Sequence, residues 1–248
     1  MSHPAVDVRG LTHAYPDGTP ALRGVDLRIL QGESVAVVGA NGAGKSTLLL
    51  HLNGLLIPSV GDVCIDGQTV TRASLPQVRR EVGFVFQDAD DQLFMPTVQD
   101  DVAFGPSNLG LTALAVQARV HAALESVGAT HLAARAPYRL SGGEKRAVAI
   151  AGVLAMEPSI LVLDEPSSGL DPAARRRLIG LLRSFTQTRV IATHDLDLVL
   201  DVCQRVVVLH DGKVQADGSP DELFADLDLL LHCHLEPPLS RQRRVRIG

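Results

Sequence analysis

The sequence SVAVVGANGAGKST, residues 34–47, joins an apolar run to a glycine-rich turn and the start of a helical pattern. Gly39, Gly44, Lys45 and Ser46 have the spacing G-x-x-x-x-G-K-S. Glycine lets a turn curl tightly without Cβ clashes, so its backbone N–H groups converge on an anion at a helix N-terminus, which carries about half a positive charge. A strand, this turn and a helix in that order predict a phosphate-binding loop.

The side chains of the loop indicate what it binds. Lys45 is expected to reach the β and γ phosphates of a nucleotide, and the Ser46 hydroxyl to coordinate Mg²⁺. The predicted nucleotide-binding residues of the loop are Gly39, Ala40, Asn41, Gly42, Ala43, Gly44, Lys45, Ser46 and Thr47.

Short apolar runs alternate with helical patterns along the rest of the chain. VGFVF (82–86), ILVLD (160–164) and RVIAT (189–193) are unbroken hydrophobic segments. Such strands between helices indicate a sheet covered on both faces. VDVRGLTHAY (6–15) and ALRGVDLRIL (21–30) are more amphipathic and predict an antiparallel region.

From about residue 88 to 149 the strand signal disappears and helical segments such as TALAVQARVHAALESVG (112–128) replace it. We therefore predict an α/β fold: a P-loop (RecA-like) core with an N-terminal antiparallel β region and an inserted helical subdomain. The predicted domain covers residues 1–225, and residues 226–248 form a short C-terminal tail.

The composition is that of an ordinary globular protein, 46% hydrophobic and 21% charged. Its apolar stretches, such as AVAIAGVLAM (147–156), fall short of the roughly 18 residues that a membrane span needs. The net charge of −5 argues against non-specific binding of nucleic acid. The basic end RQRRVRIG (241–248) is expected to be solvated.

The cysteines and the first residues bear on the compartment. Cys64, Cys203 and Cys233 have no CxxC spacing, which predicts buried, unpaired thiols in a reducing environment. The start, MSHPAVDVRG, has neither the basic region nor the apolar core of a secretory signal. We expect the protein on the cytosolic side.

Polar residues follow the predicted strands. In LVLDEP, Asp164 can hold Mg²⁺ through water, and Glu165 can polarise an attacking water. His194 follows RVIAT and can hydrogen-bond a γ-phosphate, and Gln87 ends VGFVF, where it can sense the metal and the nucleophile. The alternatives are a solvated pair of strand-end carboxylates and a surface histidine, while a single glutamine carries little information.

A second glycine-rich motif, LSGGEKRAVAI, spans residues 140–150. Ser141, Gly142 and Gly143 begin a predicted helix and so form a second anion-binding N-terminus with its own hydroxyl. Because this helix belongs to the inserted subdomain, it is placed to complete the nucleotide site of another subunit. The alternative is an ordinary serine N-cap.

The order GANGAGKST, Gln87, LSGGEKR, ILVLDEP, SGLD and His194 resembles the ATP-binding subunit of an ABC transporter over nearly the whole chain. The resemblance implies the metal and general-base roles for Asp164 and Glu165, and the Q-loop and switch roles for Gln87 and His194. It also places Tyr15 in the adenine-stacking position. A turn such as HAYPDG explains that tyrosine poorly by packing alone.

The same resemblance implies that two chains clamp two ATP molecules head to tail. Each phosphate loop faces the LSGGE of the other chain, and residues 168–171 cross between the sites, with Asp171 at the nucleotide. Because both halves are intact in this chain, we expect a homodimer. A soluble nucleic-acid-linked ATPase is the less favoured alternative, since relatives of that kind insert a long heptad coiled coil that this sequence lacks.

The segment QDADDQLFMPTVQDDVAFGPSNLGL, residues 87–111, is similar to the energy-coupling-factor group of importers, in particular the ATPase subunits for cobalt or nickel. The resemblance implies a transmembrane coupling subunit, a substrate-binding membrane subunit, and a peripheral position on the cytoplasmic face of the membrane, with no nucleic-acid partner. Vitamin importers of the same group share this segment and remain an alternative.

Two local expectations accompany this segment and the tail. The acids Asp88, Asp90 and Asp91 are expected to pair with basic residues of the coupling subunit, next to an apolar groove. The groove residues are Leu93, Phe94, Phe104 and Pro106. The run His232-Cys233-His234 is not expected to bind metal, because three adjacent residues rarely point at one ion.

Overall fold

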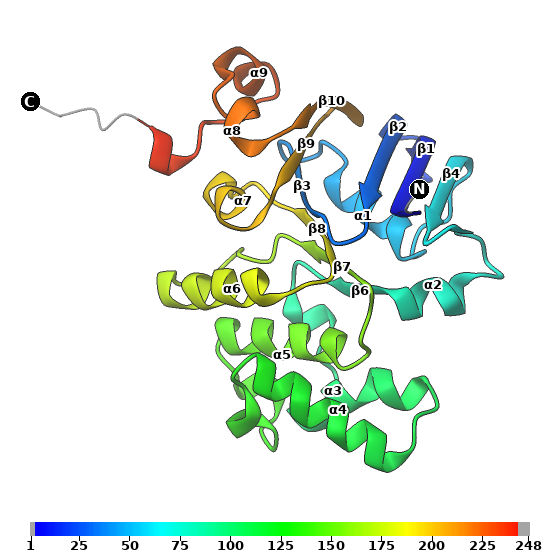
Figure 1. Ribbon diagram of the computed structural model, residues 1–248, viewed down its shortest axis with the longest axis vertical. Helices are drawn as coiled ribbons and strands as arrows, with labels where there is room; N and C mark the ends of the chain where they lie inside the picture. The colour runs from blue at the N-terminus through cyan, green and yellow to red at the C-terminus, as the bar shows by residue number, and fades with distance from the viewer. Residues whose placement is uncertain (1–2, 243–248) are drawn as a thin grey trace, which may run out of the picture.

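The computed structural model describes residues 3–242, and a six-stranded sheet runs through its centre (Figure 1). The strand order is β10-β9-β3-β8-β7-β6. Strands β9, β3, β8, β7 and β6 are parallel, and only β10 runs antiparallel to its neighbour. The bounds of these strands are β3 Ser34–Val38, β6 Val82–Val85, β7 Ile160–Asp164, β8 Thr188–Ala192, β9 Arg205–His210 and β10 Lys213–Gly218.

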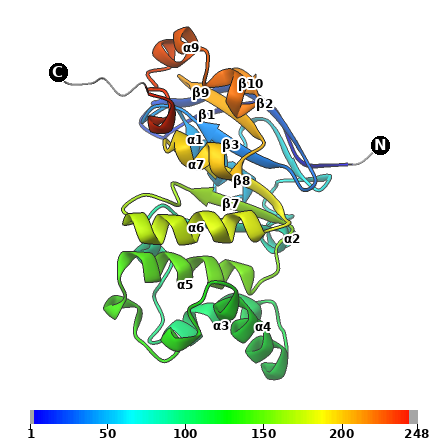
Figure 2. The same ribbon diagram turned by 60° about the vertical axis from the view of Figure 1, so that its left-hand side comes forward.

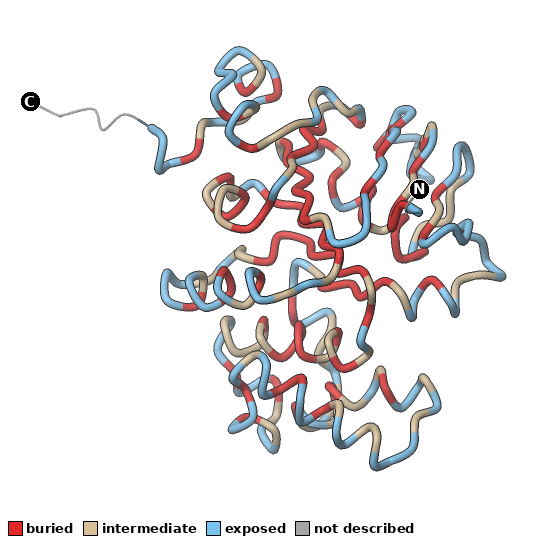
Figure 3. Tube along the Cα trace, in the orientation of Figure 1, coloured by how far each residue is buried: buried red, intermediate tan, exposed pale blue. Residues whose placement is uncertain are grey.

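Helices cover both faces of this sheet, which explains its unbroken apolar strands. Every residue of β3, β7 and β8 is buried, and Figure 3 shows these buried segments at the centre of the molecule. Helix α1, Lys45–Leu52, packs on one face, and α6, Pro172–Ser184, and α7, Leu196–Val202, pack on the other. The predicted α/β fold with its phosphate-loop core is confirmed.

A second, antiparallel sheet has the order β2-β1-β4-β5. Its strands are β1 Pro4–Ala14, β2 Pro20–Leu30, β4 Val60–Ile65 and β5 Gln68–Thr69, and α2, Leu75–Glu81, follows them. The inward side chains of this sheet, such as Val6, Leu22 and Val63, share one core with Leu48 of α1. The predicted N-terminal antiparallel region is therefore also present, and it covers the face of the main sheet that carries α1.

Three longer helices gather at one end of the molecule, beyond α6 (Figure 2). They are α3 Val98–Asn108, α4 Ala113–Ser126 and α5 Gly142–Leu154, joined by the short 3₁₀ turns η2 Thr130–Leu132 and η3 Pro137–Arg139, and preceded by η1 Ala89–Asp91. They have a hydrophobic core of their own, built from residues such as Val102, Leu124 and Val148. Helix α5 ends at Leu154, a few residues past the predicted end of the helical subdomain. The limits of that subdomain, about residues 88 to 149, stay a prediction.

The last elements form a small appendage on the β9–β10 edge. They are α8 Pro220–Leu223, α9 Leu227–His232 and the 3₁₀ turn η4 Leu239–Arg241. The expectation for the arginine-rich end falls mostly on residues 243–248, outside the described residues. All three cysteines are free, and burial raises the pKa of the Cys203 thiol to about 11. In the part of the chain that the structure describes, no helix is long and apolar enough to cross a membrane.

Candidate functional site

The loop between β3 and α1 has the backbone that its glycines make possible. Gly42 and Gly44 adopt left-handed conformations, with φ of 81° and 103°. A Cβ on Gly39 would lie 2.3 Å from the carbonyl oxygen of Leu209 in β9. Gly212, in the turn after β9, donates its N–H to the Ala43 carbonyl at 3.1 Å. The loop is thus seated against the neighbouring strand, and a side chain at Gly39 would displace it.

Lys45 occupies the centre of this loop and is 7% exposed. Its Nζ donates to the carbonyl oxygens of Gly39 and Ala40, at 2.8 and 3.2 Å. Burial lowers the pKa of Lys45, although the nearby carboxylates of Glu165 and Asp164 oppose that effect. Nζ and the Glu165 carboxylate are 3.9 Å apart. The loop and the strand β7 therefore meet at this lysine.

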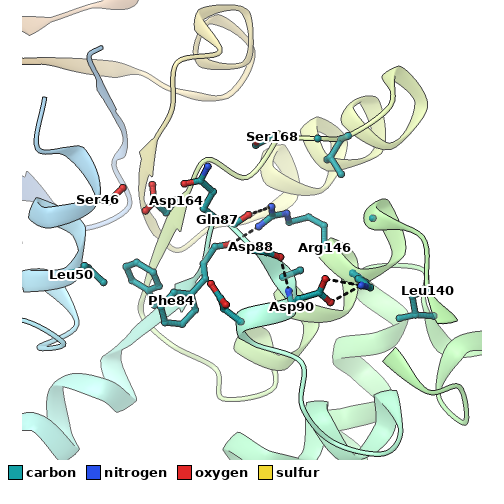
Figure 4. A pocket seen from close by; sticks show the side chains of 17 residues that line it. Ser46, Leu50, Phe84, Gln87, Asp88, Asp90, Leu140, Arg146, Asp164 and Ser168 are labelled. Atoms are coloured by element: carbon teal, nitrogen blue, oxygen red, sulfur yellow. Dashed lines mark hydrogen bonds and ion pairs between the residues drawn. The ribbon is translucent and has the colours of Figure 1, made fainter. Parts of the chain in front are cut away.

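Asp164 ends β7, and burial raises the pKa of its carboxyl group. Its Oδ1 is buried and has no hydrogen-bond partner among the residues that the structure describes. Figure 4 shows Ser46 and Asp164 on the same side of a cavity of about 700 Å³, with Gln87 nearby. The Asp164 carboxylate, the Ser46 hydroxyl and the Gln87 amide together offer hard oxygen donors, the kind of ligand that Mg²⁺ prefers.

Glu165 follows directly and has a left-handed backbone, with φ of 43°. This conformation is uncommon for a residue other than glycine and is found at functional sites. Its N–H donates to the carbonyl of Ala192, at the end of β8. Its Oε2 accepts from Thr193 Oγ1 at 3.2 Å and from the His194 N–H at 3.3 Å, and it lies 2.8 Å from Nδ1 of the His194 ring. Pairing of β7 with β8 brings these groups together.

Tyr15 lies on the other side of the phosphate loop. Its hydroxyl is 2.9 Å from Oγ1 of Thr47, and the residue is 39% exposed. A cavity of about 450 Å³ is lined by Tyr15, the loop residues 41–47, Gln87, Glu165 and His194. The structure therefore brings together the predicted residues of the phosphate loop, Tyr15 and the ends of β6, β7 and β8.

The second glycine motif stands apart from this group. Ser141 is the N-cap of α5 in a complete capping box: it accepts the Glu144 N–H, and the Glu144 carboxylate accepts the Ser141 N–H. Asp171 caps α6 in the same way, by accepting from the N–H groups of Ala173 and Ala174. Gly142 lines the far side of the cavity that holds Ser46 and Asp164. Both Ser141 and Asp171 are exposed, so their capping roles leave them accessible to another molecule.

Comparison with known proteins decides the family. Residues 22–168 match the family model described as ABC transporter. This chain is an ABC transporter ATP-binding protein. Its relatives include a putative ABC transporter ATP-binding protein of Geobacter sulfurreducens, 64% identical over 98% of this chain and 97% of the relative. The energy-coupling factor transporter ATP-binding protein EcfA of Methanothermobacter thermautotrophicus is 50% identical over 94% of this chain and 76% of its own length.

Solved structures agree with this family. CbiO1 from Clostridium perfringens, described as part of the ABC transporter complex cbiONQ, superposes with a TM-score of 0.82 at 40% identity, covering 93% of this chain and 94% of that one. The ATP-binding cassette MJ0796, solved as a dimer bound to ADP and Pi, gives 0.78 at 30% identity, covering 87% and 98%. This ABC protein is therefore an ATPase that binds ATP.

One residue of the ABC protein's site was not singled out from the sequence. Arg146 of α5 is 5% exposed, and its guanidinium donates to the carbonyl oxygens of both Phe86 and Gln87 (Figure 4). It therefore ties the helix that begins at Ser141 to the Q-loop backbone. The signal was present in LSGGEKR, but a basic residue in a helix is usually assigned to the surface.

Two of the three acids in the segment after Gln87 have partners within the chain. Asp90 forms an ion pair with Lys145 at 2.6 Å, and Asp88 accepts the Asp90 N–H as the cap of η1. Asp91 has no side-chain partner among the described residues. Asp90 is thus paired within the chain, and the pairing of these acids with a coupling subunit stays a prediction.

The apolar residues of this segment divide into two groups. Phe94 and Phe104 are 63% and 44% exposed, and their rings meet edge to face with centroids 4.9 Å apart. Pro106 is buried, and Leu93 packs against the core of the helical region. The two phenylalanines therefore provide the accessible apolar surface.

The run 232–234 is split by the fold. Cys233 is fully buried, while the rings of His232 and His234 both lie near the ring of His210, with centroid separations of 5.2 and 5.4 Å. Within residues 3–242, no three histidine, cysteine or acidic side chains are placed to hold one metal ion.

Proposed function

We propose that this ATPase is the motor of an energy-coupling-factor type importer, with Co²⁺ or Ni²⁺ as the cargo. The similarity to EcfA proteins and to cbiO1 of the cbiONQ complex supports the transporter class. In this proposal the chain binds ATP and Mg²⁺ on the cytoplasmic face of the membrane and leaves cargo binding to a membrane subunit.

The nucleotide is proposed to lie across the phosphate loop. Its phosphates are held by residues 39–47, with Lys45 at the β and γ phosphates, and the adenine stacks on Tyr15. Stacking of a base on an aromatic side chain is worth about 1–3 kcal/mol. The exposed ring of Tyr15 and the cavity of about 450 Å³ that it shares with the loop support this placement.

Mg²⁺ fits the oxygen donors beside the loop. Ser46, Gln87 and Asp164 would hold the ion, directly or through water, and the unpartnered buried Oδ1 of Asp164 is the observation that favours it. When bound, the ion neutralises negative charge on the β and γ phosphates.

Glu165 is proposed to accept a proton from the attacking water. Its carboxylate is buried at the junction of the loop and two strands, 3.9 Å from Lys45 and 2.8 Å from the His194 imidazole. His194 orients Glu165 and contacts the γ-phosphate, because its ring is the exposed end of this chain of contacts. The contact of the buried Glu165 carboxylate with the exposed His194 ring, beside the phosphate loop, is the single observation that carries the proposed hydrolysis.

Each site is proposed to be completed by a second copy of the chain. The N-terminus of α5 at Ser141, Gly142 and Gly143 faces the γ-phosphate bound by the other chain, and residues 168–171, with Asp171, cross between the two sites. The exposure of Ser141 and the dimeric ABC cassettes among the similar structures support this arrangement.

The membrane partner is proposed to dock beside Gln87. The exposed Phe94–Phe104 pair offers an apolar surface for a helix of the transmembrane subunit, and Asp91 offers a carboxylate for a basic residue at its edge. Movement of the Q-loop would then pass to the membrane subunits.

Uptake measurements test the cargo. The chain is co-expressed with its genomic neighbours, and uptake of radiolabelled Co²⁺, Ni²⁺ and vitamins is compared between wild type and Lys45→Ala. We expect uptake of Co²⁺ or Ni²⁺ that Lys45→Ala abolishes. Vitamin uptake without metal uptake would reject the cargo, and metal uptake that survives Lys45→Ala would reject this chain as the motor. Association of the purified chain with nucleic acid rather than membranes would favour the alternative class of ATPase.

A further inference from the structure

Two histidines without a role in the proposed hydrolysis lie beneath Tyr15. His13 is near the end of β1, and His51 is the penultimate residue of α1. Their ring centroids are 4.9 Å apart at 75°, and the His13 ring meets the Tyr15 ring edge to face, with centroids 5.2 Å apart. The histidine pair therefore links the tyrosine to the helix that begins at the phosphate loop.

Thr47 of the loop contacts both Tyr15 and His51. Its hydroxyl is 2.9 Å from the Tyr15 hydroxyl, and its carbonyl oxygen is 2.8 Å from Nδ1 of His51. Tyr15, Thr47, His51 and His13 thus form a closed ring of contacts. In this ring His51 contacts the loop at Thr47, and His13 contacts the ring of Tyr15.

The hydrogen bond to Thr47 fixes the tautomer of His51. A carbonyl oxygen only accepts, so Nδ1 of His51 must carry the proton and donate it. His51 is fully buried, and burial lowers its pKa, although the hydrogen bond to the Thr47 carbonyl opposes that effect. In the neutral ring, a proton on Nδ1 leaves Nε2 as an acceptor.

The Nε2 atoms of His51 and of His13 are both buried, and neither has a hydrogen-bond partner among residues 3–242. Buried polar atoms are rarely left unpaired in native proteins, and one buried water can serve two of them. The His13 tautomer with its proton on Nε2 would offer a donor to such a water, and Nε2 of a neutral His51 would offer an acceptor.

We propose that His13 and His51 are positioning residues for ATP. His51 fixes Thr47 and with it the phosphate loop, while His13 supports the edge of the Tyr15 ring and fixes the face on which the base stacks. The role of His13 rests on the proposed stacking of adenine on Tyr15. The role of His51 does not, because the loop can bind phosphates without the adenine.

Two ligands separate these roles. Binding of ATP and of inorganic tripolyphosphate is measured by calorimetry in EDTA, where no turnover consumes the nucleotide. We expect His13→Leu to weaken ATP binding about 3- to 10-fold, the range of one lost hydrogen bond or aromatic contact, and to leave tripolyphosphate binding unchanged. We expect His51→Leu to weaken the binding of both ligands by a similar factor.

Polar replacements of His51 test the hydrogen bond itself and guard against a variant that folds poorly. The amide nitrogen of His51→Asn sits where Nδ1 sits and can donate to Thr47, whereas the longer side chain of His51→Gln places its amide at the position of Nε2. Asn is therefore expected to restore tripolyphosphate binding to within about twofold, and Gln to remain as weak as Leu. His121→Leu, at a ring that is 69% exposed on α4, is the control and should bind both ligands normally.

Equal binding by His51→Asn and His51→Gln would overturn the role of His51. An unchanged ATP affinity in His13→Leu, while Tyr15→Ala binds ATP weakly, would overturn the role of His13. If Tyr15→Ala binds ATP as tightly as wild type, the stacking proposal and the His13 role both fail, and the tripolyphosphate series still decides the role of His51.

Discussion

Oε2 of Glu165 lies 2.8 Å from Nδ1 of His194, although the two residues leave different strands of the sheet. Glu165→Gln keeps the size of the side chain and removes its capacity to accept a proton. We expect ATP hydrolysis to fall about 10²- to 10⁴-fold, or about 3–5 kcal/mol in barrier, with ATP binding retained. Phosphate release and nucleotide binding are measured on the same preparation. Hydrolysis at the wild-type rate would remove Glu165 from its proposed role.

The same variant tests the proposed homodimer. Because Glu165→Gln binds ATP without consuming it, the closed dimer should accumulate. Sedimentation velocity is expected to show a monomer without nucleotide and a dimer in saturating ATP. A monomer under both conditions counts against sites shared between two copies.

Ser141→Arg should stop turnover while leaving ATP binding to the phosphate loop intact. The arginine fills the space in front of the α5 N-terminus, where the γ-phosphate of the other chain is proposed to bind. Loss of the helix cap by itself costs only about 1 kcal/mol of stability.

Ser219→Arg is a matched control for this change. Ser219 caps α8 through Glu222, with Oγ to Oε2 at 2.8 Å, the same arrangement as Ser141 with Glu144. It should lose similar stability and keep its ATPase activity. Full activity in Ser141→Arg would contradict the completed site.

Arg146→Lys is expected to destabilise the fold, because one ammonium group cannot match the planar fork that reaches two carbonyl oxygens. A buried carbonyl left unpaired costs about 1–3 kcal/mol, which lowers the Tm of a chain of this size by roughly 2–10 °C. Arg176→Lys, at an exposed position of α6, is the control. Calorimetric melting curves compare the two, and equal Tm values would show that the bridge contributes nothing.

Asp101 gives a pH-dependent prediction. It is 8% exposed and accepts the N–H groups of Phe94 and Met95 through one oxygen, but burial raises its pKa above that of the unfolded chain. A raised carboxyl pKa favours folding at low pH, and this contribution is lost as the pH rises through the folded-state value.

Asp101→Asn keeps the accepting oxygen and cannot ionise. Its Tm should therefore exceed that of wild type at pH 7, and the difference should shrink as the pH falls toward the carboxyl pKa of the unfolded chain, about 4. Asp91→Asn, on the exposed surface, should show no such trend. A Tm gain that is constant with pH would mean that ionisation of Asp101 is not its cause.

The sequence was most informative where a backbone conformation requires particular residues. Gly39 and Gly44 predicted the loop, since no other residue fits beside Leu209 or adopts the backbone of Gly44. The covered sheet followed from unbroken apolar strands. Long-range polar contacts were not predictable, because the partners of Arg146 and Lys145 lie in segments that only the fold brings together. The same is true of His13 and His51, whose isolated imidazoles carry no periodic or motif signal.

Strand β3, which carries the phosphate loop, sits between β8 and β9, and Ser34 pairs with Arg189. During translation the loop therefore leaves the ribosome long before either neighbouring strand has been synthesised. β3 has two unpaired edges until β8 and β9 have been synthesised. Unpaired edges of an apolar strand promote aggregation. We therefore expect the first third of the chain to need protection during synthesis, by chaperones or by the early antiparallel sheet, until β8 and β9 emerge.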